Sequence, residues 1–239
     1  MKTLLIFLIV ILLQTSALAQ TAGEFTELGI EVGKSGNLSL AIEIFTFAIE
    51  IDSCYALAYY NRGFAYSCLQ DNTSAIPDYT KDMELNPKHQ TAYRNRGLIY
   101  FELKEFAKAI GDFTKAIEIG ADFAEIYLTR GVCQYELGKY TKAITDFSKA
   151  IEKKPEYPDA YMKRGSIYLL SKEYVKAIED YTRAIETGQV PGYEFNNLHY
   201  IRGYAYYMSG DTIRACKDWQ KAYSQGYTDA KEFMDKYCK

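Results

Sequence analysis

Small and aromatic residues recur along this chain at the spacing of an α-helix. Tyr59 lies four residues before Gly63 and Tyr66 lies three residues after it, so the three side chains share one helical face. A second stripe begins twelve residues beyond Gly63, with Ala75 followed four residues later by Tyr79. The pattern predicts two amphipathic helices that pack antiparallel across a short turn.

These paired stripes return at a fixed period. Their register mark is an Arg-Gly dipeptide, and the first three steps between dipeptides are 34 residues each, while the last step is 38. The dipeptides are Arg62-Gly63, Arg96-Gly97, Arg130-Gly131, Arg164-Gly165 and Arg202-Gly203. A fixed period of this length indicates one helix pair that is copied and stacked, each copy burying its apolar face against its neighbours.

The order of aromatic, Gly, Tyr, Ala, aromatic and Ala over 34 residues resembles the tetratricopeptide repeat. The resemblance implies an all-α, right-handed α-solenoid of about six 34-residue helix-turn-helix units within residues 20–229, and residues 230–239 then form a C-terminal capping helix. The expected repeats span 22–55, 56–89, 90–123, 124–157, 158–191 and 196–229. The chain departs from the family in having Arg before the Gly, where Leu is usual, and four extra residues before the last repeat.

Each of these arginines is followed sixteen residues later by an aspartate. The pairs are Arg62 and Asp78, Arg96 and Asp112, Arg130 and Asp146, Arg164 and Asp180, and Arg202 and Asp218. The first repeat lacks both partners and has Leu28 and Ile44 instead. We interpret the pattern as structural ion pairs, within a repeat or to the next one, that neutralise half-buried arginines. The alternative is an arginine ladder that binds an anionic ligand.

Residues 1–19 are typical of a secretory signal peptide. Lys2 precedes an apolar run from Leu4 to Leu13, and Ala17-Leu18-Ala19 follows. The run is too short to span a bilayer, which disfavours the alternative of an uncleaved membrane anchor. We therefore expect export to the periplasm or the outside of a bacterial cell, with no membrane span after removal of the signal.

The C-terminal segment is expected to cap the stack. Phe233, Met234 and Tyr237 fall at helical spacing, and Asp229 precedes them as a candidate helix cap. A terminal repeat without such a cap would expose its apolar face to solvent.

Cys216 and Cys238 lie symmetrically about Gly226-Tyr227, so antiparallel packing would bring them level. In an exported protein this placement predicts a disulfide. The alternative is two buried thiols in contact. The other cysteines, which have no level partner, are expected to be packed side chains: Cys54, Cys68 and Cys133.

The composition offers little for catalysis or for nucleic-acid binding. The formal net charge is −3, whereas phosphate recognition needs a basic stripe. His89 falls between repeats and His199 occupies a core aromatic position, and neither sits in a ligand or nucleophile motif. We expect no enzymatic activity, no cofactor and no metal.

The resemblance also implies that the first helix of each repeat lines a concave groove. Carried onto this sequence, the groove face comprises Tyr60, Phe64, Ser67, Arg94, Leu98, Phe101, Leu128, Val132, Tyr135, Met162, Ser166, Leu169, Tyr200, Tyr204 and Tyr207. This face is mainly apolar and aromatic, which suits an extended peptide or a helix of another protein. Some of these tyrosines would instead pack against the next repeat.

Some family members grip a partner's C-terminal carboxylate with a set pattern of Lys and Asn. Asn61 and Asn95 match one element of that pattern, but Tyr60, Phe64, Thr26 and Ile30 stand at the other positions. The sequence thus favours a non-catalytic interaction scaffold without this clamp. A module that binds an envelope glycan or small ligand through the aromatic groove is the alternative, and self-association through an end of the stack remains open.

Overall fold

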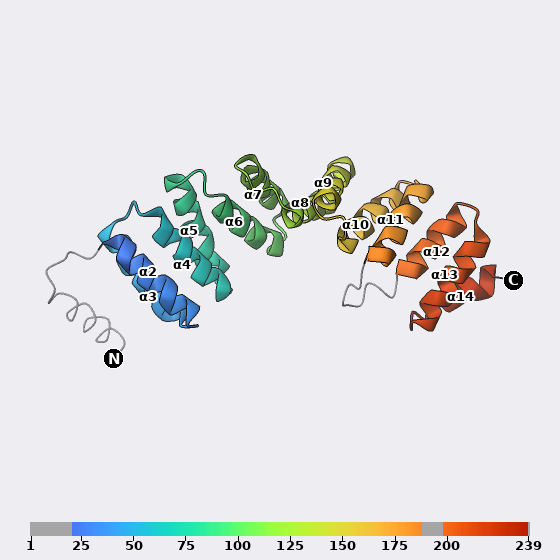
Figure 1. Ribbon diagram of the computed structural model, residues 1–239, viewed down its shortest axis with the longest axis horizontal. Coiled ribbons are helices and arrows are strands. Elements are labelled where there is room, and N and C mark those ends of the chain that lie inside the picture. The colour runs from blue at the N-terminus through green and yellow to red at the C-terminus, as the bar shows by residue number, and fades with distance from the viewer. Residues whose placement is uncertain (1–20, 188–197, 239) are drawn as a thin grey trace. The chain divides into compact units, whose positions relative to one another are not determined.

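The computed structural model describes residues 21–187 and 198–238 (Figure 1). The expected signal peptide and the four extra residues before the last repeat, 192–195, lie outside these ranges. Within them every regular element is a helix, which confirms the all-α repeat fold. None of the described helices is long and apolar enough to cross a membrane.

The chain divides into two compact units, an N-terminal unit up to Ile99 and a C-terminal unit from Tyr100. The boundary falls inside α6. The helices are α2 (Ala22–Lys34), α3 (Leu38–Ile51), α4 (Ala56–Cys68), α5 (Asn72–Leu85), α6 (Gln90–Glu102), α7 (Phe106–Glu118), α8 (Ala124–Glu136), α9 (Tyr140–Lys153), α10 (Pro158–Leu170), α11 (Tyr174–Thr187), α12 (Leu198–Met208), α13 (Thr212–Ser224) and α14 (Ala230–Tyr237).

Short turns join the two helices of each repeat, and each turn holds one residue in the left-handed backbone region. Glycine takes this place in three turns, at Gly36, Gly138 and Gly210. The other three turns place Gln70, Lys104 and Lys172 there, with φ near +60°. The repeats therefore share a left-handed residue at this turn although the residue type differs.

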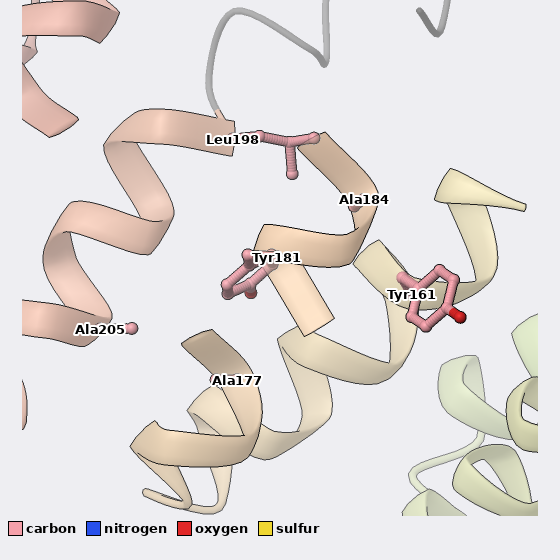
Figure 2. Packing of buried hydrophobic residues seen from close by; sticks show 6 residues of the cluster. All are labelled: Tyr161, Ala177, Tyr181, Ala184, Leu198 and Ala205. Atoms are coloured by element: carbon pink, nitrogen blue, oxygen red, sulfur yellow. The ribbon is translucent and has the colours of Figure 1, made fainter. Parts of the chain in front are cut away.

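The core is a series of local clusters rather than one closed interior. Figure 2 shows one of them, where Tyr181 of α11 lies among residues of α10, α11 and α12. The buried members are Tyr161, Ala177, Tyr181, Ala184, Leu198 and Ala205. Gly165 lets α10 approach this ring, because a Cβ there would lie 3.3 Å from Tyr181. Small residues on one helix thus make room for an aromatic side chain on the next.

In four of the repeats the arginine binds the expected aspartate within its own helix pair. Arg62 donates from Nε to Asp78 Oδ2 at 2.8 Å and from Nη2 to Asp78 Oδ1 at 2.7 Å. The same two-bond geometry joins Arg130 to Asp146, Arg164 to Asp180 and Arg202 to Asp218. The hydrogen bonds to Asp78 raise the pKa of Arg62 above its ordinary value. These arginines are therefore neutralised and do not form a ladder for an external anion.

Each arginine also bonds to the preceding repeat, which the sequence reasoning missed. Arg62 Nη1 donates to Thr46 Oγ1 at 3.1 Å, and Arg96 Nη1 donates to Thr80 Oγ1 at 2.7 Å. Thr114, Ser148 and Thr182 accept in the same way from the arginines of the following repeats. The pairing of Arg96 with Asp112 stays a prediction.

The C-terminal helix α14 packs against α13, and a disulfide joins Cys216 to Cys238 with a Cα–Cα distance of 5.6 Å. Two expectations, about the cap of α14 and about the free cysteines, are wrong. The Asp229 side chain makes no capping hydrogen bond, since its own backbone is already helical at φ −63° and ψ −23°. Cys54 and Cys68 are exposed, and only Cys133 among the three free cysteines is buried, which raises its pKa to about 12.

Candidate partner-binding face

In the N-terminal unit the groove face presents one strongly exposed aromatic side chain. Phe64 of α4 is 49% exposed, a high value for so large an apolar group. Tyr60, one turn earlier, is half-buried, and burial raises its pKa. Its ring centroid lies 4.5 Å from that of His89, and its hydroxyl accepts a 3.3 Å hydrogen bond from Asn95 Nδ2. Tyr60 therefore belongs to the framework, while Phe64 is available for contact.

Phe64 borders an apolar cavity of about 210 Å³ within this unit. Three helices build it: α2 and α4 bring groove-face positions, and α3 closes the space between them. Ile30 is one of these positions, because it precedes Phe64 by one full repeat of 34 residues. The lining residues are Gly29, Ile30, Gly33, Lys34, Leu38, Ala41, Phe45, Asn61, Phe64 and Ala65.

Small residues create this space. Gly33, Ala41 and Ala65 leave room between the larger side chains of Leu38 and Phe45. Of the polar side chains that line it, Asn61 donates from Nδ2 to Leu57 O at 2.8 Å within its own helix. Lys34 at the end of α2 is exposed and supplies a positive charge. An apolar side chain that entered the cavity would gain about 2 kcal/mol from leaving water.

The other groove-face residues at the end of the N-terminal unit are less open. Arg94 and Leu98 are half-buried on α6, and Arg94 Nη1 donates to Asn95 Oδ1 at 3.3 Å. Asn95 therefore engages both Tyr60 and Arg94. Like Asn61, Asn95 makes its hydrogen bonds within the protein.

In the C-terminal unit the middle of the groove face is also half-buried. Leu128, Val132 and Tyr135 pack against the cluster that contains Phe147. Met162 and Leu169 pack against the cluster drawn in Figure 2. Phe101 and Tyr135 each pair with an aromatic residue that opens the next helix, at ring distances of 6.1 Å to Phe106 and 5.7 Å to Tyr140.

The last three tyrosines of the groove face contact the capping helix. Phe233 of α14 lies 5.3 Å from Tyr200 and 6.4 Å from Tyr204, measured between ring centroids, and Tyr237 lies 4.5 Å from Tyr207. The expectation that these rings await a partner is therefore revised. The chain's own helix α14 packs against these three rings.

A buried acid was also missed from the sequence. Asp82 is fully buried on α5 and lies 2.7 Å from His89 Nδ1, with Tyr60 beside the histidine ring. The signal was present in the repeat register, because the other repeats carry alanine at this position: Ala48, Ala116, Ala150, Ala184 and Ala222. Within the described residues no group of three or more histidine, cysteine or acidic side chains could hold a metal ion.

Comparison with protein families gives four matches, two of which overlap. A tetratricopeptide repeat model matches residues 56–89 and 158–187, a second one matches residues 91–123, and a TPR repeat model matches residues 134–172. No curated protein matches the sequence at a significant level.

Solved structures with similar folds are also repeat proteins. MamA is 27% identical, with a TM-score of 0.66 over 74% of this chain and 94% of MamA. YrrB, a TPR protein with an unusual peptide-binding site, is 22% identical, with a TM-score of 0.68 over 76% of this chain and 92% of YrrB. A tetratricopeptide repeat protein from Parabacteroides merdae ATCC 43184 is 25% identical, with a TM-score of 0.54 over 91% of this chain and 84% of that protein.

Proposed function

Because this chain is a tetratricopeptide repeat protein, we propose that it is a non-catalytic scaffold that holds a peptide segment or a helix of a partner protein on its groove face. Stacked helix pairs offer extended surfaces that suit such contacts. The observation that carries the proposal is the apolar cavity beside Phe64, because it is a preformed place for a partner side chain.

The cavity also defines the partner segment. Its walls are aliphatic and aromatic, so the anchoring side chain is Leu, Ile, Met or Phe. Lys34 borders the cavity, so an acidic residue near the anchor would form a favourable charge pair. The segment is therefore apolar at one position and acidic close by.

The scaffold would act outside the cytoplasm. Residues 1–19 carry the signal-peptide pattern, and the Cys216–Cys238 disulfide suits an oxidising compartment. We place the protein in the periplasm or among secreted proteins of a bacterium.

Binding of an envelope glycan through the tyrosines is less well supported. Stacking on a sugar needs free ring faces, whereas Tyr60 packs on His89, and Tyr200 and Tyr207 pack on α14. Phe64 remains exposed but stands at an apolar cavity, which suits a peptide side chain better than a sugar.

Site-specific photo-cross-linking tests the proposal. A photoreactive phenylalanine replaces Phe64 in the protein expressed in its host, and the products are identified by mass spectrometry. The matched control carries the same group at Ile213 of α13, which is 75% exposed and lies outside the groove face. The proposal predicts recurrent cross-links from position 64 to one polypeptide segment with an apolar anchor. Cross-links to saccharide alone, or the same products from both positions, would overturn it.

A further inference from the structure

The exposed apolar side chains of the C-terminal unit gather at the turns within repeats. Eight large apolar side chains are exposed among its described residues, and all but Tyr223 lie at these turns. The seven are Leu103, Leu137, Tyr140, Leu170, Val175, Met208 and Ile213. Successive helix pairs stack in one direction, so their turns lie along one edge of the unit (Figure 1). We call residues 102–108, 136–142, 170–176 and 208–214 the turn edge.

The last two repeats depart from the earlier ones at two positions of this edge. Leu170 and Met208 fill the first position, and Val175 and Ile213 fill the second. The two preceding repeats have exposed, smaller or charged residues there: Glu102, Ala107, Glu136 and Thr141. The helix pair therefore needs no large apolar residue at either position. Val175 is nevertheless 65% exposed and Ile213 is 75% exposed, so folding leaves both in water, and contiguous exposure of this kind marks an interaction surface.

The charges of the unit are also divided between its two edges. The turn edge has seven basic and five acidic residues, whereas the connections between repeats at 118–125 and 152–159, on the opposite edge, have two basic and six acidic residues. Basic neighbours hold three of the turn-edge acids in ion pairs. Four turn-edge lysines make no ion pair with the described residues: Lys104, Lys139, Lys142 and Lys172. The turn edge is therefore the side of the unit that favours an anionic surface.

Tyrosine rings accompany the basic side chains in the same two repeats. Lys176 Nζ lies 5.2 Å from the ring centroid of Tyr168, and the Arg214 guanidinium carbon lies 5.0 Å from that of Tyr206. A tyrosine ring has an apolar body and a polar tip, which suits the boundary between water and lipid. The edge thus combines exposed aliphatic side chains, basic groups and tyrosines, the residue types of proteins that lie on a membrane surface.

We propose that the turn edge of the C-terminal unit docks on the surface of a lipid bilayer that contains anionic lipids. Leu170, Val175, Met208 and Ile213 enter the boundary between headgroups and acyl chains, and the turn-edge lysines contact lipid phosphates. The acidic opposite edge then faces away from the membrane.

A bilayer fits this edge better than a protein partner does. The apolar side chains stand on separate turns with charged residues between them, whereas a stable protein interface buries a core from which charged residues are depleted. Fluid acyl chains can surround each apolar side chain separately while the basic groups stay at the headgroups. The turn edge shares no residue with the groove face, so the scaffold could hold a partner while it lies on the membrane.

Vesicle flotation with the purified protein, lacking residues 1–19, tests the proposal. One set of vesicles contains one part phosphatidylglycerol and three parts phosphatidylethanolamine, and the other contains phosphatidylcholine alone. We expect the protein to float with the anionic vesicles and to bind phosphatidylcholine on the order of tenfold more weakly or not at all. Salt at about 0.5 M should weaken the binding, because it screens the attraction between lysines and phosphates.

Two double variants separate the apolar contribution from the charged one. Val175→Thr with Ile213→Thr copies the threonine of the repeat at 124–157 and nearly keeps the side-chain shape, so we expect this variant to stay folded. It should bind anionic vesicles on the order of tenfold more weakly. Lys139→Gln with Lys172→Gln should weaken the binding by a similar factor and reduce its dependence on salt.

The matched controls lie on α13, the helix that carries Ile213. Tyr223→Thr and Lys221→Gln change an exposed apolar and an exposed basic side chain at the end of this helix that is remote from the turn edge. Both controls should bind vesicles as the wild type does.

The proposal is overturned if the protein does not float with anionic vesicles, or if it binds phosphatidylcholine equally well. It is also overturned if the controls weaken binding as much as the turn-edge variants, or if those variants bind unchanged while circular dichroism shows them to be folded. Sedimentation analysis covers the other occupant of such an edge. A dimer that Val175→Thr with Ile213→Thr abolishes, in a protein that binds no vesicles, would assign the edge to a second copy of the chain.

Discussion

Arg164 donates a 2.8 Å hydrogen bond from Nη1 to Ser148 Oγ in the repeat before its own. The same guanidinium holds Asp180 of its own repeat through Nε and Nη2. One side chain thus joins three helices, α9, α10 and α11, and links the packing within a repeat to the packing between repeats. The sequence agrees with this role. The Arg and Asp positions are filled from the second repeat onward, whereas the accepting hydroxyl is already present in the first repeat.

Asp180→Asn should lower the stability more than Ser148→Ala. The first change leaves a half-buried arginine without its charge partner, at a cost of about 3 kcal/mol. The second removes one hydrogen bond to a charged group, at a cost of about 1.5 kcal/mol. Glu118→Gln breaks only an exposed pair with Lys115 and should cost less than about 0.5 kcal/mol. Urea unfolding of the three variants gives the order, and equal losses in all three would contradict the bridging role.

Two glycines in the C-terminal unit should respond to alanine in opposite ways. A Cβ on Gly131 of α8 would lie 2.7 Å from the Phe147 ring, so Gly131→Ala forces the helices apart and should cost about 2 kcal/mol. A Cβ on Gly111 of α7 meets nothing within 4 Å, so Gly111→Ala should add up to about 1 kcal/mol through helix propensity. Thermal unfolding measures the stability of both variants. If Gly111→Ala lost as much stability as Gly131→Ala, the space around the new Cβ would not explain the difference.

The repeat fold could be predicted from the sequence because the 34-residue period and the helical spacing coincide at several positions. The aspartate partners of Arg62 and Arg164 followed from the same register. The hydroxyl partners recur at the same 34-residue step, from Thr46 to Thr182. The register does not say which side chain they meet, because that depends on how one repeat sits on the one before it. Nor could the register show that Phe233 covers the last tyrosines, since that depends on where α14 docks.

The cavity beside Phe64 shows the same limit. Its volume depends on which side chains are small at neighbouring positions of three helices, and no single stripe records that. The register places Ile30 one repeat before Phe64, but it does not show the space beside them.

The Cys216–Cys238 disulfide should stabilise the C-terminal cap. It closes a 22-residue separation, for which Cys238→Ala should cost about 3 kcal/mol on the chain-entropy estimate. A reducing agent should lower the stability of the wild-type protein to that of the variant and leave the variant unchanged. Thiol labelling of denatured, unreduced protein exported to an oxidising compartment should count three free thiols. A count of five would contradict the pairing.

His199 should make the last repeat sensitive to mild acid. Burial lowers its pKa below the ordinary 6.5, although nearby Asp218 acts in the opposite direction. The unfolded chain therefore takes up a proton at a higher pH than the folded chain, so stability falls as the pH drops from about 6.5 through the folded pKa. His199→Tyr, which restores the residue of the other repeats, should flatten that part of the curve. An unchanged pH slope in the variant would contradict the assignment.

The central claim is that the groove face near Phe64 holds a partner peptide by an apolar anchor. Selection of a displayed random-peptide library on the purified protein, followed by affinity measurement of the enriched peptides, tests it most directly. The account predicts peptides with a large apolar residue near an acid, and affinity that falls on the order of tenfold or more in Phe64→Arg and Ile30→Arg but not in Ile213→Arg. Failure to enrich any peptide, or equal affinity in all three variants, would contradict the claim.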